Sequence, residues 1–147
     1  MVLEVVEETT IPLEQEIELC RLHLQVMSLR LNKDLRLETQ YLTANEQHYI
    51  PPLVLHTLVE NGVTHGYRGR KSGCFFVRSR QHGDKLIISF FNDGALQSGS
   101  ASKGTGIGLR YVRSRLNEAY GSHWKLRSFI TGKGWKIIVQ LPINKEK

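Results

Sequence analysis

The sequence has only two cysteines among its 147 residues, Cys20 and Cys74, and they do not form a CxxC motif. This scarcity argues against a zinc site and a disulfide framework, and it fits a reducing, cytosolic setting. No apolar run approaches the roughly 20 residues that cross a bilayer. The acidic N-terminus does not have the form of a secretory signal. The length predicts a single domain with one core.

The net charge is +6, but the sequence has no long basic run. A basic chain can bind nucleic acid or a polyanionic small ligand. Scattered cations are equally typical of a solvated surface, and both interpretations stay open here. Nucleic-acid binding is disfavoured, because the pattern shows no surface that combines stacking aromatic and basic side chains.

Hydrophobic spacing predicts three helices, over Leu13–Leu31, Ile50–Gly66 and Ile107–Ala119. Period-2 patterns and turn residues predict strands at 35–38, 74–80, 85–91, 124–130 and 135–141. We expect residues 1–12 to be a lead-in segment and residues 13–147 to form the domain. This order predicts an α/β protein, specifically an α+β two-layer sandwich with a mixed, mostly antiparallel sheet and helices on one face.

The apolar stretch from Leu53 to Gly66 contains two polar residues, Glu60 and Asn61, side by side. Asn is a mediocre helix former, so its presence needs a reason. Asn61 and His65 lie one turn apart and share a helix face. An Asn carbonyl with a nearby Glu can hold a hydrated magnesium ion. The alternatives are a buried Asn61 amide satisfied by backbone and a helix-end His65 favoured by the helix dipole.

A glycine-rich hexamer, GTGIGL, follows the polar loop Asn92–Gly106 and opens the third predicted helix. Its residues are Gly104, Thr105, Gly106, Ile107, Gly108 and Leu109. Glycine lets a backbone approach a ligand closely, and the first N–H groups of a helix lack partners, so such a segment can bind phosphate. The alternative is a flexible linker with a glycine helix start. The spacing fits neither a Rossmann fingerprint nor a Walker loop.

Three elements therefore occur in order: Glu60-Asn61 on a helix, Asn92-Asp93-Gly94 after a strand, and GTGIGL before a helix. This ordered set resembles the GHKL (Bergerat-fold) ATPases. IPPLVLHTLVENGVTHG resembles the N box of the LytS-like two-component sensor histidine kinases, and KGTGIGLRYVRSRLNEAYG resembles their G2 box. PLEQEIELCRLHLQVMSLRL is similar to the linker helix before that domain. The resemblance runs from about Leu13 to Leu141.

The resemblance implies a cytoplasmic domain of a membrane sensor that uses ATP and Mg²⁺ to phosphorylate a histidine. Asn61 is the implied magnesium ligand, and Glu60 is the implied catalytic residue that supports the metal or polarises the nucleophile. The implied ATP-binding residues include His65, Asn92, Asp93 and Gly94, with Asn92 and Gly94 facing adenine. The backbone of GTGIGL would hold phosphates, with Arg113 or Arg115 reaching them.

The sequence departs from the family pattern at three places. Asn92 stands where the adenine-binding motif has Asp, and Thr64 stands where Lys often precedes the N-box His. The phospho-accepting histidine segment is absent, and His23 falls on the linker helix. We therefore interpret the chain as a fragment that will not autophosphorylate alone. Its expected partners are the histidine-containing dimerisation domain of the same receptor and a response regulator, with no membrane contact of its own.

Two other interpretations remain at this point. The departures at Asn92 and Thr64 leave open a nucleotide-free GHKL-fold module that binds proteins. A GHKL serine kinase or an ATP-driven clamp is disfavoured by the linker helix and the IPPL start. A carboxylate at position 92 would accept a charge-assisted hydrogen bond from adenine, so we expect Asn92→Asp to tighten ATP binding by about 1 kcal/mol.

Overall fold

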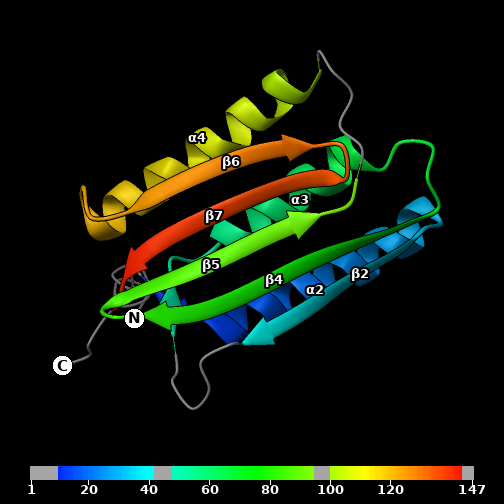
Figure 1. Cartoon of the computed structure of the whole chain (residues 1–147). Coiled ribbons are helices and arrows are strands. Elements are labelled where there is room, and N and C mark those ends of the chain that lie inside the picture. Colours follow the sequence, from blue (N-terminus) through cyan, green and yellow to red (C-terminus); the bar gives the residue numbers. More distant parts are fainter. Residues whose placement is uncertain (1–9, 42–47, 95–99, 144–147) are drawn as a thin grey trace, which may run out of the picture.

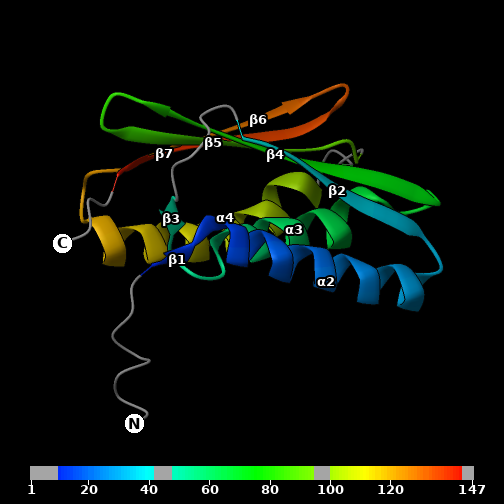
Figure 2. The ribbon, with the colours of Figure 1, turned by 90° about the horizontal axis from the view of Figure 1, so that it is seen from below.

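The computed structural model describes residues 10–41, 48–94 and 100–143, with the side chains of 100–107 left outside that description. A five-stranded sheet forms one layer and three helices form the other, all on one face of the sheet (Figures 1 and 2). The helices are α2 (Leu13–Leu31), α3 (Val54–Gly66) and α4 (Ser100–Tyr120). The main strands are β2 (Asp34–Tyr41), β4 (Ser72–His82), β5 (Lys85–Asn92), β6 (Lys125–Thr131) and β7 (Gly134–Pro142). The predicted α+β two-layer sandwich is confirmed.

The sheet has the strand order β2-β4-β5-β7-β6. β2 pairs with β4 in parallel, and the other three pairs are antiparallel. The sheet is therefore mixed and mostly antiparallel, as predicted. The helix α2 precedes β2 and α3 connects β2 to β4, so the helices cross under the sheet and their inner faces meet its apolar side.

Alternation along the strands builds the core, because successive side chains in a strand point to opposite faces. In β5, Leu86, Ile88, Phe90 and Asn92 are buried while the residues between them are half-buried. The neighbouring strands contribute in the same way, and Trp135 is fully buried at the start of β7. Asn92 is the one polar residue on the inner face of β5, which sets it directly beneath the helices.

Aromatic and basic side chains do meet on the outer face of the sheet. Phe76 pairs with Phe91, with ring centroids 5.9 Å apart, and Lys136 lies between Phe91 and Phe129 in register. The inference that no surface combines stacking aromatic and basic side chains, which was drawn from the sequence pattern, is therefore wrong. Sheet pairing brings these residues together from four strands, which the spacing along the chain does not reveal.

Two short strands precede α3, and the helix begins later than predicted. β1 (Ile11–Pro12) pairs antiparallel with β3 (Tyr49–Ile50), so the end of the expected lead-in joins the fold. The prediction that the helix begins at Ile50 is wrong, because α3 begins at Val54. A residue that precedes proline is pushed away from helical backbone angles. Ile50 and Pro51 each precede a proline, so the helix cannot easily begin at either of them.

The long helix α2 has the predicted bounds. Asn32 adopts a left-handed conformation with φ 57° and ends the helix, as a C-terminal Asn often does. Leu13, Ile17, Cys20 and Leu24 form its buried face, and burial raises the pKa of the Cys20 thiol. Within the described residues, none of the helices is long and apolar enough to cross a membrane.

The helix α4 begins at Ser100, earlier than the predicted start at Ile107. The prediction of a loop through Gly106 is therefore wrong from Ser100 onward, and residues 95–99 lie outside the described part of the chain. Each glycine lowers helix propensity by about 1 kcal/mol relative to Ala, so the local pattern argues against a helix here. α4 packs beside α3, and this tertiary contact is present where local propensity disfavours a helix.

Candidate functional site

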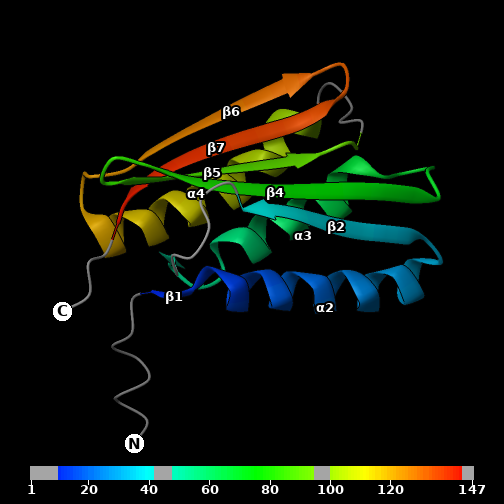
Figure 3. The same cartoon turned by 60° about the horizontal axis from the view of Figure 1, so that its bottom comes forward.

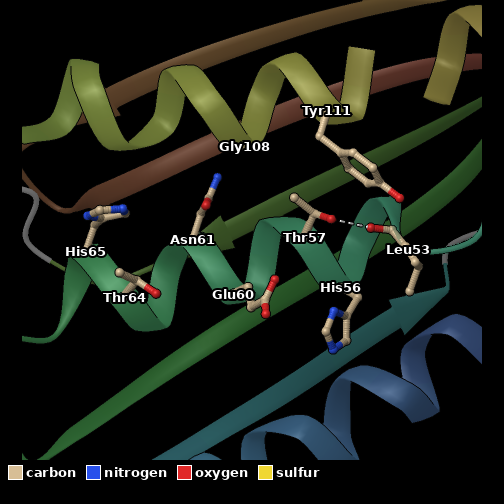
Figure 4. A pocket seen from close by; sticks show the side chains of 9 residues that line it. All are labelled: Leu53, His56, Thr57, Glu60, Asn61, Thr64, His65, Gly108 and Tyr111. Carbon is tan, nitrogen blue, oxygen red and sulfur yellow. Dashed lines mark hydrogen bonds between the residues drawn. The ribbon is translucent and has the colours of Figure 1, made fainter. Parts of the chain in front are cut away.

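A pocket of about 670 Å³ opens between α3 and α4 (Figure 4). Its size is within the usual range of small-molecule sites, roughly 300–1,000 Å³. Seven of its lining residues come from α3 and the turn before it, and two come from α4. The lining residues are Leu53, His56, Thr57, Glu60, Asn61, Thr64, His65, Gly108 and Tyr111.

Helical periodicity explains why these residues gather. Positions three and four residues apart fall on one helix face, so Thr57, Asn61 and His65 follow one line along α3. His56, Glu60 and Thr64 form a second line beside it. The opposite side of α3 is apolar and packs into the core through Leu55, Leu58 and Val59, among others. One face of α3 thus holds the fold and the other lines the pocket.

Asn61 points from α3 towards Gly108 on α4 (Figure 4). Its Nδ2 atom is buried and has no hydrogen-bond partner among the described residues. A Cβ atom at position 108 would overlap the Asn61 amide, so only glycine lets α4 lie this close to α3. A buried amide donor without a partner costs free energy of folding, about 1–3 kcal/mol. Its retention at a pocket wall points to a ligand.

Glu60 and His65 also line the pocket, as does Thr64, which stands where the family often has Lys. Glu60 is exposed. Among the described residues that line the pocket, Glu60 is the one with a carboxylate and Asn61 the one with a side-chain amide. The structure therefore brings together four of the predicted site residues, Glu60, Asn61 and His65 from α3 and Gly108 from α4. His56, Thr57 and Tyr111 were missed by sequence reasoning. For His56 and Thr57 a signal existed, since each lies one turn before a predicted residue.

His56 lines the pocket and also contacts α2, where its ring packs edge-on against the ring of His23, with the ring centroids 4.7 Å apart. Burial lowers the pKa of His23, and the nearby His56 lowers it further, whereas Glu60 raises it. The His23 Nε2 atom is buried without a partner in the described part of the chain. The neutral imidazole is therefore the form that packs between the two helices. The prediction that His23 is no phosphate acceptor fits this packed position.

Asn92 lies on the sheet side of α3, fully buried. Its Oδ1 accepts a hydrogen bond from the Gly94 N–H at 3.1 Å, while its Nδ2 has no partner among the described residues. A Cβ atom at Gly62 would come within 3.0 Å of that Nδ2, and one at Gly94 within 2.5 Å of the Gly66 carbonyl oxygen. Asn92 and Gly94 thus pack tightly beneath α3, and neither lines the pocket described above.

Asp93 is held in a cluster at the end of α3. Its Oδ1 accepts hydrogen bonds from the Tyr67 hydroxyl at 2.8 Å and the Cys74 N–H at 2.9 Å. Arg70 lies over the Tyr67 ring and donates to the Asp93 carbonyl at 2.6 Å. Burial and the bond to Asp93 raise the pKa of Tyr67, so its hydroxyl stays a donor. Asp93 therefore has a structural role here, and its part in cofactor binding stays a prediction.

The glycine-rich hexamer lies within α4, not ahead of it. The unpaired N–H groups of a helix are its first four, here those of residues 100–103. The N–H groups of Gly104, Gly106 and Gly108 fall beyond them, so in this conformation they are not free to hold phosphate. The side chains of Thr105 and Ile107 lie outside the described residues, and Leu109 packs against the core.

The two arginines proposed to reach phosphate differ in their surroundings. Arg115 donates to the Pro52 carbonyl at 3.4 Å and pairs with Glu118 at 2.9 Å, which ties α4 to the start of α3. Arg113 is exposed on α4 and is not among the described residues that line the pocket. The role of Arg113 stays a prediction.

Comparison with known proteins adds a separate line of support. No family model matches the chain. Sensor protein LytS of Streptococcus mutans is 28% identical over 151 residues, which cover 95% of this chain and 26% of that protein. LytS of Enterococcus faecalis is 25% identical over 156 residues, with the same coverage. Sensor histidine kinase BtsS of Escherichia coli is 24% identical over 115 residues, covering 78% of this chain and 20% of BtsS. Over most of its length, the chain is thus similar to LytS sensor proteins and to the sensor histidine kinase BtsS.

Solved structures of histidine kinases share the fold of this chain. The nucleotide-free catalytic domain of histidine kinase ThkA has a TM-score of 0.64 and 19% identity, covering 91% of this chain and 95% of that one. Histidine kinase AdeS of Acinetobacter baumannii has a TM-score of 0.67 and 16% identity, covering 92% and 67%. The chain spans about a quarter of the length of the first LytS proteins it matches.

Proposed function

We propose that this chain is the ATP-binding catalytic domain of a sensor histidine kinase. It would bind Mg·ATP between α3 and α4 and donate the γ-phosphoryl group to a histidine on a separate dimerisation domain. The observation that carries the proposal is Asn61 at the wall of a pocket of suitable size, where its Nδ2 donor is buried without a described partner and would meet a ligand acceptor such as a phosphate oxygen. The similarity to LytS proteins supports the reaction, and the fold of histidine kinase catalytic domains supports the site.

The residues at the pocket fit magnesium that arrives with a nucleotide. In the described part of the chain, no three His, Cys, Asp or Glu side chains are arranged to hold a metal ion. Mg²⁺ keeps several waters and is typically held by one or two protein oxygens plus substrate phosphates. Asn61 Oδ1 and the Glu60 carboxylate would supply those oxygens. Bound Mg²⁺ would neutralise phosphate charge during transfer.

The remaining work of the chain is positioning. Glu60 would orient the metal waters or the nucleophile from the second line of α3. His65, in the last turn of α3, would lie near the phosphates as a hydrogen-bond donor. Proximity of a bound acceptor histidine to the γ-phosphoryl group supplies much of the rate in such transfers, so this chain alone would not phosphorylate itself.

Phosphate binding by the glycine-rich hexamer would require the first turns of α4 to unwind. Three glycines within five residues, at 104, 106 and 108, make this part of the helix intrinsically weak. Unwinding would free their N–H groups to donate to phosphate. It would also move Gly108 away from Asn61, so that the Asn61 side chain becomes accessible to the metal. The close contact of Gly108 with Asn61 would then mark the conformation without nucleotide.

The partners follow from the same proposal. The acceptor would be the histidine-containing dimerisation domain of the same receptor, and a response regulator would take the phosphoryl group from it. Histidine kinase ThkA has been solved in complex with the response regulator TrrA, with a TM-score of 0.61 and 22% identity to this chain over 99% of it and 46% of ThkA. We extend the proposal to a cytoplasmic domain of a membrane sensor.

Asn92→Asp tests the adenine contact. The Asp would keep an acceptor for the Gly94 N–H and place a second, charged acceptor where Nδ2 now has no described partner. We expect ATP binding to tighten by about 1 kcal/mol, roughly fivefold, while the protein without nucleotide becomes less stable because a charge is buried. Calorimetric titration and thermal melts would measure the two effects.

Asn92→Ala is the matched control, because it removes both the acceptor and the donor without adding charge. It should weaken ATP binding. Equal or weaker ATP affinity in Asn92→Asp would show that Asn92 does not contact adenine. In that case the nucleotide-free interaction module becomes the better account of this fold.

A further inference from the structure

The outer face of the sheet is cationic over β4, β5, β7 and β6. These four strands contain six Arg or Lys residues and no Asp or Glu. Because side chains alternate along a strand, all six project from the face that the helices leave open. They are Arg78, Arg80, Lys85, Lys125, Arg127 and Lys136. Within the described residues, none of the six takes part in an ion pair. Much of the positive charge of the chain is therefore gathered, unpaired, on one face.

Three phenylalanine rings form a row across the strands of this cationic face. Register places Phe76 of β4 beside Phe91 of β5, and Lys136 of β7 between Phe91 and Phe129 of β6. Phe76 and Phe129 are 41% and 42% exposed. All three helices lie on the opposite side of the sheet, as Figures 2 and 3 show, so no described helix covers the row. Exposed apolar side chains that cluster, unlike single ones, mark interaction sites.

Each ring of the row has a cation beside it. The pairs are Phe76 with Arg78, Phe129 with Arg127, and Phe91 with Lys136. The two arginines stand two residues from their rings on the same strand face, which is about 6.6 Å. A nucleotide of a single strand presents a flat base and a phosphate, so a ring can stack on the base while the neighbouring cation binds the phosphate. The row runs over three strand steps, about 14 Å, and offers three such pairs.

We propose that this face binds single-stranded RNA, with about three bases stacked on the phenylalanine row and their phosphates held by the adjacent cations. Aromatic side chains on an open sheet hold two or three bases of single-stranded RNA in the same manner. Ser89 and Gln140 favour RNA over DNA. They lie on the same face between the cations of β4 and β6, and their side chains both donate and accept hydrogen bonds, as a 2′-hydroxyl requires.

A duplex and a membrane both fit this face less well. The bases of a duplex are already stacked on one another, so the rings would have no base to meet. A membrane-bound surface buries connected apolar area roughly 5–10 Å into the headgroup boundary. Here the charged Lys136 separates Phe129 from the other two rings, and Glu38 of β2 stands beside Phe76. Glu38 would face a flat anionic membrane, whereas a single strand can pass beside it.

Fluorescence anisotropy of a labelled oligouridylate, titrated with the full chain, tests the proposal. Binding should be saturable. The logarithm of the affinity should fall against the logarithm of salt concentration with a slope of about −2, because each of three phosphates contributes roughly 0.7. An oligodeoxyuridylate of equal length should bind more weakly, and an RNA duplex should compete poorly. Saturating Mg·ATP should not displace the RNA, because the phenylalanine row lies on the other side of the sheet from the pocket between α3 and α4.

The variants Phe76→Ala and Phe129→Ala should each weaken RNA binding about fivefold or more, the lower end of what one stacked base contributes. Ile130→Ala is the matched control, because Ile130 follows Phe129 in β6, is 57% exposed and projects from the opposite face. It should bind RNA like the unmodified chain. Arg127→Gln should make the salt slope shallower by about 0.7, whereas Arg30→Gln, an equal change of charge on α2, should leave it unchanged.

Four results would overturn the proposal. The first is RNA affinity that both phenylalanine variants keep, with circular dichroism unchanged, since stacking would then contribute nothing. The second is equal affinity for the oligodeoxyuridylate, and the third is displacement of the RNA by Mg·ATP. The fourth is binding to vesicles of anionic phospholipid, lost in the same variants, without binding of oligouridylate, which would assign the face to a membrane. None of these results depends on ATP turnover, so the inference fails independently of the proposed function.

Discussion

Glu16→Ala is expected to lower the free energy of unfolding by about 3 kcal/mol. Glu16 is fully buried on α2, and its two carboxylate oxygens accept hydrogen bonds from the N–H groups of Leu53 at 3.0 Å and His56 at 3.1 Å. These groups belong to the first turn of α3, which has no acidic residue and no side-chain cap of its own. The alanine leaves both donors unpaired and removes a negative charge from a helix N-terminus.

Urea unfolding followed by circular dichroism measures this loss. Glu16→Gln keeps the shape and one acceptor, so it should lose only part of the stability. Glu18→Ala is the matched control, since Glu18 is exposed on the same helix, and its effect should stay within about 0.5 kcal/mol. A loss below about 1 kcal/mol in Glu16→Ala would mean that α3 does not depend on this carboxylate.

Asn61→Ala is expected to abolish the tightening of ATP binding by magnesium. Removing a group that holds or orients a metal typically costs on the order of 10- to 100-fold in affinity. Glu60 would then be the only carboxylate or amide oxygen left on the described pocket wall. The variant should melt at or above the temperature of the unmodified chain, because it removes a buried Nδ2 donor that has no described partner.

Calorimetric titrations with ATP, with and without Mg²⁺, make the comparison. Thr64→Ala is the matched control, because Thr64 lines the same pocket from the same helix without offering a carbonyl oxygen. It should keep the magnesium dependence. Unchanged magnesium dependence in Asn61→Ala would exclude Asn61 as the metal ligand.

The elements with strong local signals could be predicted from the sequence. The bounds of α2 follow from its apolar spacing and from Asn32, which ends the helix in a left-handed conformation. The hairpin of β4 and β5 follows from alternation around Gly83, which has the positive φ of 64° that its turn requires. In these places local preference and tertiary structure agree.

The errors lie where distant contacts outweigh local preference. The start of α4 was predicted too late because Gly104, Gly106 and Gly108 lower helix propensity, and the contact of Gly108 with Asn61 cannot be seen in the sequence. The role of Glu16 was missed for a related reason, since it caps a helix that begins far along the chain. One signal was available. Leu53 is a poor N-cap, and a helix without a local cap needs an acceptor from elsewhere.

The candidate site was predicted in part. The α3 residues Glu60, Asn61 and His65 line one pocket, because helical periodicity alone places them together. Asn92 lies buried on the other side of α3. The Asp93 carboxylate already accepts hydrogen bonds from the Tyr67 hydroxyl and the Cys74 N–H. Their positions depend on how β5 packs beneath the helix, which no spacing along the chain encodes.

Titration of the ¹⁵N-labelled chain with Mg²⁺ and a non-hydrolysable ATP analogue, followed by amide NMR spectra, tests the central claim most directly. Nucleotide bound between α3 and α4 should shift, in a saturable way, the amide signals of α3 from Glu60 to Gly66 and of the glycine-rich start of α4. The glycine amides should lose helical shifts as the first turns unwind. A folded chain whose spectrum stays unchanged at millimolar nucleotide, or shifts only on the outer face of the sheet, would contradict the account.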